Sequence, residues 1–223
     1  MIDLFFRDPN EYFMIILVVI FSICCHEYMH ARVALWQGDS TAADQGHLTL
    51  NPLKQMGMFS LFLVSIIGVA FGAVPVDHSR MRHRYSPALV SFAGPFTNLM
   101  LFLAFCIGIV IVALKSGSMS KDVVSGAWDL FRWGGTLNVI LFCLNMLPIP
   151  PLDGYEILAY FFPQIHRLDQ NVRNTIFIVM MVVIFASSRY IFVFGELLTL
   201  ITTNFMYYTS VHAIKLLHLE GLF

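Results

Sequence analysis

The sequence has few charged residues. Only 12% of its 223 residues are charged and 58% are hydrophobic, whereas about 25% of the residues in soluble domains are charged. This composition excludes an ordinary soluble globular domain and favours an integral membrane protein. The net charge of −1 gives no reason to expect a nucleic-acid partner, which would need a basic surface.

Cysteine is also scarce, and the sequence has no internal repeats or low-complexity segments. The cysteines form no C-x-x-C pair and lie in apolar runs, at Cys24, Cys25, Cys106 and Cys143. We interpret them as buried small hydrophobic residues. No stretch has the composition of a soluble domain. We therefore expect one membrane domain over residues 1–223, with its core at about 12–160 and a C-terminal helical region at 170–223.

Long apolar runs dominate the rest of the chain. They lie at about 12–36, 58–76, 86–114, 128–147 and 175–205. The last run is either one long helix or two helices that turn near residues 187–188. The predicted fold class is an all-α polytopic membrane protein, with a bundle of about four to six transmembrane helices. Between the first two runs, GHLTLNPLK (46–54) alternates Leu48 and Leu50 with polar residues, which predicts a short β-strand or hairpin.

Basic residues flank the two sets of helix ends unequally. One set carries seven of them and the other three: Arg32, Lys54, Arg80, Arg82, Arg84, Arg167 and Arg173 against Arg7, Lys115 and Lys121. Because the more basic side faces the cytoplasm, we expect the first set to be cytoplasmic and the N-terminus to lie outside.

The stretch CCHEYMH places three ionisable groups at the end of the first apolar run. His26, Glu27 and His30 form the pattern H-E-x-x-H. Residues four apart share one face of a helix, so both imidazoles can bind one metal ion while Glu27 acts as general base on a water. Ionisable groups inside membranes are rare and usually functional. The alternative is a polar cluster or proton relay without metal.

A catalytic zinc needs a third protein ligand. The candidates are His47, Asp39, Asp44, Asp77, Asp153, His166 and Glu196. Asp153 is favoured because it follows the helix-breaking prolines of NMLPIPPLDG and precedes Gly154. Its alternative is an ordinary Asp-Gly turn at the membrane surface.

A shared metal site constrains the topology. His26, His30 and Asp153 all follow the C-terminal parts of apolar runs, so the runs at 12–36 and 128–147 must be parallel. Two apolar runs lie between them, so one of the two must not cross the membrane. The run at 58–76 is broken by Gly68, Gly72 and Pro75. We therefore predict that it re-enters and leaves on the cytoplasmic side, covered by protein or lining a cavity.

Four ordered motifs resemble the site-2 protease family of intramembrane zinc metalloproteases. They are HEYMHARVA (26–34), GHLTLNPLK (46–54), AGPFTN (93–98) and NMLPIPPLDG (145–154). The resemblance implies one Zn²⁺ per chain held by His26, His30 and Asp153, with Glu27 as catalytic base. It also implies that Asn98 and Asn145 hold substrate backbone or the oxyanion. The sequence departs from the family in lacking an acidic residue after NPLK, in DGY replacing DGG, and in having no PDZ-like stretch.

The expected function is regulated intramembrane proteolysis of transmembrane protein substrates. We expect an integral protein of the prokaryotic inner membrane, with its active site toward the cytoplasm and a regulatory membrane partner as an option; the oligomeric state stays open. A substrate helix must unwind before cleavage, and the strand around His47 to Leu50 is expected to offer it an edge. Two alternatives are a membrane protein that binds or transports a divalent metal, and an inactive relative that acts as a binding partner.

Overall fold

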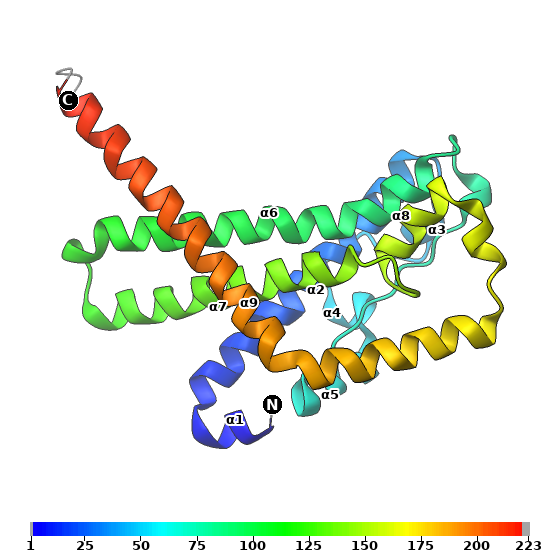
Figure 1. Cartoon of the computed structure of the whole chain (residues 1–223), viewed down its shortest axis with the longest axis horizontal. Coiled ribbons are helices and arrows are strands. Elements are labelled where there is room, and N and C mark those ends of the chain that lie inside the picture. The colour runs from blue at the N-terminus through cyan, green and yellow to red at the C-terminus, as the bar shows by residue number, and fades with distance from the viewer. Residues whose placement is uncertain (1, 220–223) are drawn as a thin grey trace.

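A computed structural model describes residues 2–219, and their regular structure is helical (Figure 1). The long helices are α2 (Pro9–Trp36), α6 (Ser86–Lys115), α7 (Lys121–Asn145) and α9 (Gln170–Leu219). The shorter α-helices are α1 (Ile2–Arg7), α3 (Thr41–Asp44), α4 (Pro52–Gln55), α5 (Gly57–Ile67) and α8 (Asp153–Phe161). Short 3₁₀ turns cover His78–Arg80, Ser116–Ser118 and Pro163–Arg167. The predicted all-α architecture is thus confirmed for this part of the chain.

Within residues 2–219, three helices are long and apolar enough to cross a membrane. They lie at Pro9–Trp36, Ser86–Ser118 and Gln170–His212, with mean hydropathies of 1.9, 2.6 and 2.3. Helix α7 has 25 residues, enough length to cross, but it also carries Lys121, Asp122, Asp129 and Arg132. The total of four to six transmembrane helices remains a prediction.

Helices α2, α6 and α7 form the centre of the molecule. Val33 near the end of α2 packs with Val90 near the start of α6, and His26 earlier in α2 bonds to Asn98 later in α6. These two helices are therefore antiparallel. Asn98 of α6 bonds to Asn138 of α7, while Phe105 further along α6 contacts Gly134 earlier in α7. Helix α7 is therefore antiparallel to α6 and parallel to α2 (Figure 1), which is the relation that the shared metal site requires.

The connection between α2 and α6 begins and ends beside the C-terminal end of α2. Along it, Met56 packs on Ile23 and Cys24, and Ser65, near the end of α5, accepts a bond from Tyr12. The chain then turns at Gly68, which is left-handed with φ 81°, and returns to Asp77, whose amide bonds to Asp39. Helix α5 has 11 residues, about 16 Å, which is too short to cross a hydrocarbon core of about 30 Å.

The predicted β-strand at 46–54 is wrong. Residues 47–51 have irregular backbone, and no strand occurs within residues 2–219. The physical reason is the buried Gln55 side chain, which donates from Nε2 to the carbonyls of both His47 and Thr49. These carbonyls are the groups that a strand partner would have used, and α4 follows directly.

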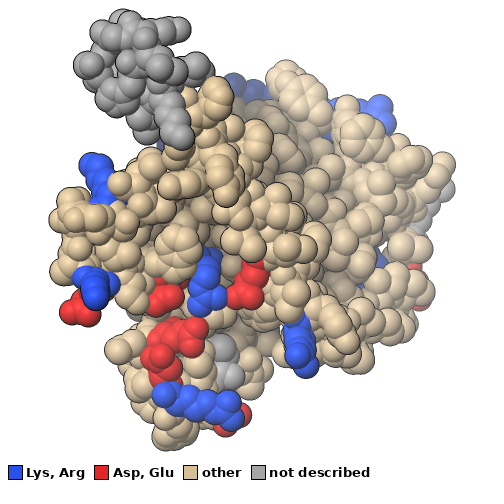
Figure 2. Space-filling view, turned by 60° about the vertical axis from the view of Figure 1, so that its left-hand side comes forward, with Lys and Arg blue, Asp and Glu red and all other residues tan. Residues whose placement is uncertain are grey.

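The last apolar region is one helix rather than two. Helix α9 has 50 residues and changes direction part-way, in the orange part of Figure 1. Most residues of its first half are exposed, and Met180 is buried. Figure 2 shows a surface that is mostly uncharged, with charged side chains confined to small groups. One group is Arg132 of α7 between Glu11 and Glu196. The scarcity of charged side chains on the rest of this face suits a lipid environment.

Candidate metal centre and active site

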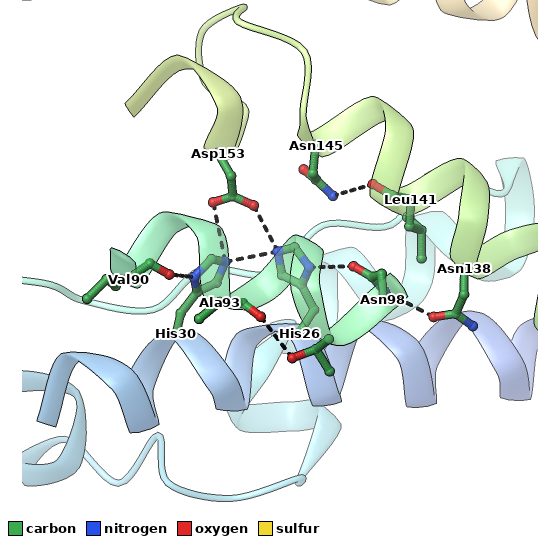
Figure 3. Close-up of polar contacts among 10 residues, drawn as sticks. His26, His30, Val90, Ala93, Asn98, Asn138, Leu141, Asn145 and Asp153 are labelled. Atoms are coloured by element: carbon green, nitrogen blue, oxygen red, sulfur yellow. Dashed lines mark hydrogen bonds and ion pairs between the residues drawn. The ribbon is translucent and has the colours of Figure 1, made fainter. Parts of the chain in front are cut away.

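Three predicted ligands converge at one point (Figure 3). Nε2 of His26 lies 3.1 Å from Oδ2 of Asp153, Nε2 of His30 lies 3.3 Å from Oδ1 of Asp153, and the two Nε2 atoms are 2.9 Å apart. The two histidines are buried and Asp153 is partly buried. In the described part of the chain they are the one group of His, Cys, Asp or Glu residues found with this spacing.

Asp153 is positioned by the break between α7 and α8. Helix α7 ends at Asn145, and Pro148, Pro150 and Pro151 prevent it from continuing. Gly154 then allows α8 to start against the end of α7, because a Cβ there would lie 2.5 Å from the carbonyl oxygens of Met146 and Leu147. The glycine of the Asp-Gly pair therefore lets the two backbones approach closely, and this approach places the carboxylate over the histidines.

Hydrogen bonds at Nδ1 fix both imidazoles. His30 Nδ1 lies 2.7 Å from the carbonyl oxygen of Val90, which can only accept, so His30 carries its hydrogen there. His26 Nδ1 lies 2.6 Å from Oδ1 of Asn98 and donates in the same way. In the neutral imidazoles, both Nε2 atoms then direct lone pairs at each other and at a carboxylate.

This donor set fits a metal ion. Without a hydrogen between them, two imidazole lone pairs and a carboxylate at these distances need a cation among them. Two histidines and one aspartate are an established ligand type for catalytic zinc, which keeps a further position open. The Nδ1 hydrogen bonds are the outer partners that such ligands usually have.

Gly94 of α6 gives the imidazoles their room. A Cβ at this position would overlap His30 Nε2 and would lie 2.5 Å from Cε1 and Nε2 of His26. A side chain at position 94 would therefore occupy the space between the ligands. The motif AGPFTN contained this glycine, but its steric role could not be read from the sequence.

Glu27 is buried and faces a cavity of about 390 Å³. Its carboxyl group has no hydrogen bond or ion pair with any other described residue, so it is available to a water. On its other side lies the backbone of Gly72, where a Cβ would overlap the Glu27 side chain. The cavity volume corresponds to about a dozen waters, which is ample for a hydrolytic reaction.

Both polar and apolar residues line the cavity. The three proposed ligands, Glu27, Asn98 and Asn145 are among the polar ones, and the returning segment after α5 contributes Ala70, Phe71, Val74 and Val76. His78, which follows this segment, also lines the cavity. The returning segment after α5 was predicted to be covered by protein or to line a cavity, and it lines the cavity that Glu27 faces.

The other proposed third ligands lie elsewhere or have other partners. Asp39 accepts bonds from Thr41 and Asp77, Asp44 from Ser40, and Asp77 from Ser79, while Glu196 pairs with Arg132. The buried Nδ1 of His47 has no hydrogen-bond partner. The side chain of His166 lies outside the described residues.

The two asparagines differ in their surroundings. Asn98 is fully buried, and both ends of its amide are hydrogen-bonded: Oδ1 to His26 and Nδ2 to Asn138. Asn145 is partly exposed at the cavity, and its Nδ2 bonds back to the carbonyl of Leu141. Asn138 was not singled out as a site residue. A lone amide in an apolar helix was the available signal, but its partner could not be known from the sequence.

Comparison with known proteins agrees with this geometry. The sequence model of peptidase family M50 matches residues 107–187. YwhC of Bacillus subtilis, which is named as a zinc metalloprotease, is 38% identical over 155 residues, covering 68% of this chain and 69% of that protein. The chain belongs to peptidase family M50, the site-2 protease family.

Other relatives match at lower identity. Rip2 of Mycolicibacterium smegmatis is 34% identical over 161 residues, or 67% of this chain and 59% of that protein. Rip2 of Mycobacterium tuberculosis (H37Rv) is 31% identical over 153 residues, or 65% of this chain and 56% of that protein. Both are named as zinc metalloproteases, and the match spans little more than half of their length. No solved structure gave a significant match.

Proposed function

We propose that this chain is an intramembrane zinc endopeptidase that hydrolyses peptide bonds within or near transmembrane segments of membrane proteins. The observation that carries this proposal is the convergence of His26, His30 and Asp153 beside an unpartnered Glu27. The site lies on a cavity inside an apolar helical bundle, and the family membership is consistent with it.

The groups that would bind the proposed zinc are Nε2 of His26, Nε2 of His30 and the carboxylate of Asp153. We propose one ion per chain. When bound, zinc supplies Lewis acidity that polarises the scissile carbonyl and makes a water more acidic. Asp153 balances the positive charge, and Val90 and Asn98 hold the two imidazoles with their lone pairs inward.

Glu27 performs the proton transfers in this proposal. Its carboxylate takes a proton from the attacking water and then donates it to the leaving amine, which is the usual role of the glutamate in H-E-x-x-H. Two features support this role: the side chain faces the cavity, and it has no competing partner among the described residues.

Substrate contacts are assigned to the cavity walls. Asn145 has one amide hydrogen committed to Leu141, which leaves its oxygen and second hydrogen for a substrate backbone or the oxyanion. Asn98 is completely buried, so we assign it to His26 and not to the substrate. Residues 47–50 do not form a strand, so they offer no strand edge to a substrate. The non-helical residues 70–76, several of which line the cavity, are the better surface for an unwound substrate segment.

The proposed location is a prokaryotic inner membrane, with the N-terminus outside and the active site toward the cytoplasm. The seven basic residues of the expected cytoplasmic set flank the site end of α2 and α6 or the start of α9. Arg7, Lys115 and Lys121 lie in α1, at the end of α6 and at the start of α7. The substrates are transmembrane proteins, and a regulatory membrane partner is compatible with the broad exposed surface of α9.

A transport function finds little support. Of the polar residues that could form a path, Asn98 and Asn138 are locked in hydrogen bonds with one another and with neighbours, and Glu196 is paired with Arg132. An inactive relative would not need the complete set of ligands and base.

The test is the metal content of the purified protein, wild type beside Asp153→Ala and Glu27→Gln. We expect about one zinc per wild-type chain, a weakened or lost ion in Asp153→Ala, and full zinc in Glu27→Gln. With a transmembrane substrate, Glu27→Gln should lower cleavage by roughly 10²–10⁴-fold. Folded wild type that takes up no added zinc would overturn the proposal, and zinc retained in Asp153→Ala would overturn the choice of third ligand.

A further inference from the structure

A buried chain of polar groups connects His26 to the backbone of α7. Nδ1 of His26 is 2.6 Å from Oδ1 of Asn98, and Nδ2 of Asn98 donates to Oδ1 of Asn138 at 3.1 Å. Nδ2 of Asn138 donates to Oγ of Ser22 at 2.9 Å and to the carbonyl oxygen of Gly134 at 2.8 Å. The three polar side chains beyond His26 are fully buried.

The carbonyl of Gly134 gives this chain a fixed direction. A carbonyl oxygen can only accept, so Asn138 must present its NH₂ group to it. The oxygen of Asn138 then faces Asn98, which must in turn present its own NH₂ group. Reversing either amide would bring two oxygens or two NH₂ groups together in a fully buried place, which costs about 1–3 kcal/mol for each unsatisfied group.

The direction continues to the proposed metal ligand. With its NH₂ group committed to Asn138, Asn98 can offer only its oxygen to His26 (Figure 3). The hydrogen of the neutral imidazole is thereby placed on Nδ1, and the lone pair of Nε2 faces His30 and Asp153. A backbone group two side chains away thus determines which nitrogen of His26 is free to bind.

We propose that Asn138 is a positioning residue that acts through Asn98 to hold His26 in the form that binds zinc. The inference rests on the proposed function, since it takes His26 as a zinc ligand. Nothing in this role requires Asn138 to touch zinc or substrate.

The same residue sets the position of α2 against α7. Ser22 lies one turn before His26 on α2, and Asn138 lies two turns before Asn145 on α7. The bond between Ser22 and Asn138 therefore fixes the level at which the two histidines meet the end of α7, from which Asp153 follows. The Ser22 hydroxyl can either donate or accept, so it is the carbonyl of Gly134 that fixes the direction of the Asn138 amide.

Zinc affinity measured by chelator competition tests the role. Asn138→Leu and the smaller Asn138→Ala remove the chain beyond Asn98 without touching a ligand. We expect each to weaken zinc binding roughly 10-fold, at the lower end of the 10–100-fold effects of outer partners of metal ligands. Thr136→Val is the matched control: Thr136 lies on the same helix, is equally buried, and has a hydroxyl without a partner. Its affinity should equal that of the wild type.

A double-mutant cycle separates positioning from packing. Asn98→Leu should weaken zinc binding about 10–100-fold. Adding Asn138→Leu to it should cause a smaller further loss than Asn138→Leu causes in the wild type, because the part of its effect that passes through Asn98 is already gone. Independent packing defects would instead multiply. In the Co²⁺-substituted protein, both single variants and the double variant should show the same altered visible absorption spectrum.

The outcomes also separate this inference from the proposed function. Wild type that binds no zinc overturns the function itself. Wild type that binds zinc, together with Asn138 variants of unchanged affinity and spectrum, overturns the positioning role alone. Multiplicative losses in the cycle overturn it as well.

Discussion

Gly94 and His30 are so close that one additional carbon atom cannot fit between them. A Cβ on Gly94 would overlap Nε2 of His30 and would lie 2.5 Å from Nε2 of His26. These nitrogens are the two proposed zinc-binding atoms. The approach of α6 to α2 therefore leaves no room for a methyl group beside these nitrogens.

Gly94→Ala should impair zinc binding while the helices remain assembled. We expect the affinity, measured by chelator competition, to fall by at least about 10-fold, since the new methyl group displaces the imidazoles from their common point. Gly126→Ala is the control, because a Cβ there meets nothing within 4 Å. Equal zinc affinities in the two variants would contradict the placement of the ion between His26, His30 and Asp153.

Gly72→Ala should have a different effect, because its Cβ would overlap Glu27 and not a ligand. We expect zinc content close to that of the wild type and a fall in cleavage that approaches that of Glu27→Gln. The measurement pairs zinc content with the rate of cleavage of a transmembrane substrate. Loss of zinc in Gly72→Ala would mean that the returning segment supports the ligands themselves.

Ser60 attaches this returning segment to α5. Its buried hydroxyl donates to the carbonyl of Phe71 at 2.6 Å and accepts from the Phe71 amide at 2.9 Å. Ser60→Ala leaves both backbone groups without a partner, so we expect a loss of about 1–3 kcal/mol in unfolding free energy and faster proteolysis after α5. Ser65→Ala is the control, since the Ser65 hydroxyl bonds only within its own helix, to the carbonyl of Leu61. Similar losses of unfolding free energy in both variants would contradict the proposal that Ser60 attaches the returning segment to α5.

The sequence allowed the ligand positions to be predicted because their signals are local. His26 and His30 share a helical face by their spacing, and the prolines before Asp153 end a helix whatever surrounds it. The parallel course of α2 and α7 followed from the requirement that these residues meet.

Other features depend on partners distant in sequence and were missed for that reason. The alternation of Leu48 and Leu50 predicted a strand, but the Gln55 side chain takes its carbonyls. Glu196 was a candidate metal ligand, whereas its partner is Arg132 of α7. Asn138 was one of several amides in apolar helices until its bond to Asn98 distinguished it.

Asp39 connects the end of α2 to the segment that leads into α6. Its fully buried carboxylate accepts from the Thr41 amide at 3.0 Å and hydroxyl at 2.5 Å, and from the Asp77 amide at 2.7 Å. Burial raises the pKa of Asp39, but the hydrogen bonds from Thr41 and Asp77 outweigh it, so the pKa lies below its ordinary value. The carboxylate is therefore the form that holds the returning segment beside the site.

Asp39→Asn should destabilise the protein at neutral pH by about 1–3 kcal/mol, because an NH₂ group then faces one of the donors. Since the folded pKa is lowered, the wild-type contribution is complete above about pH 5 and disappears as the pH falls through the folded pKa. Thermal unfolding measured from pH 7 to pH 3.5 should show that the difference in melting temperature between wild type and variant becomes smaller as the pH falls. Asp44→Asn, at an exposed carboxylate bonded to Ser40, should show no comparable difference. If this difference did not change with pH, the effect of the substitution would not depend on the ionised form of Asp39.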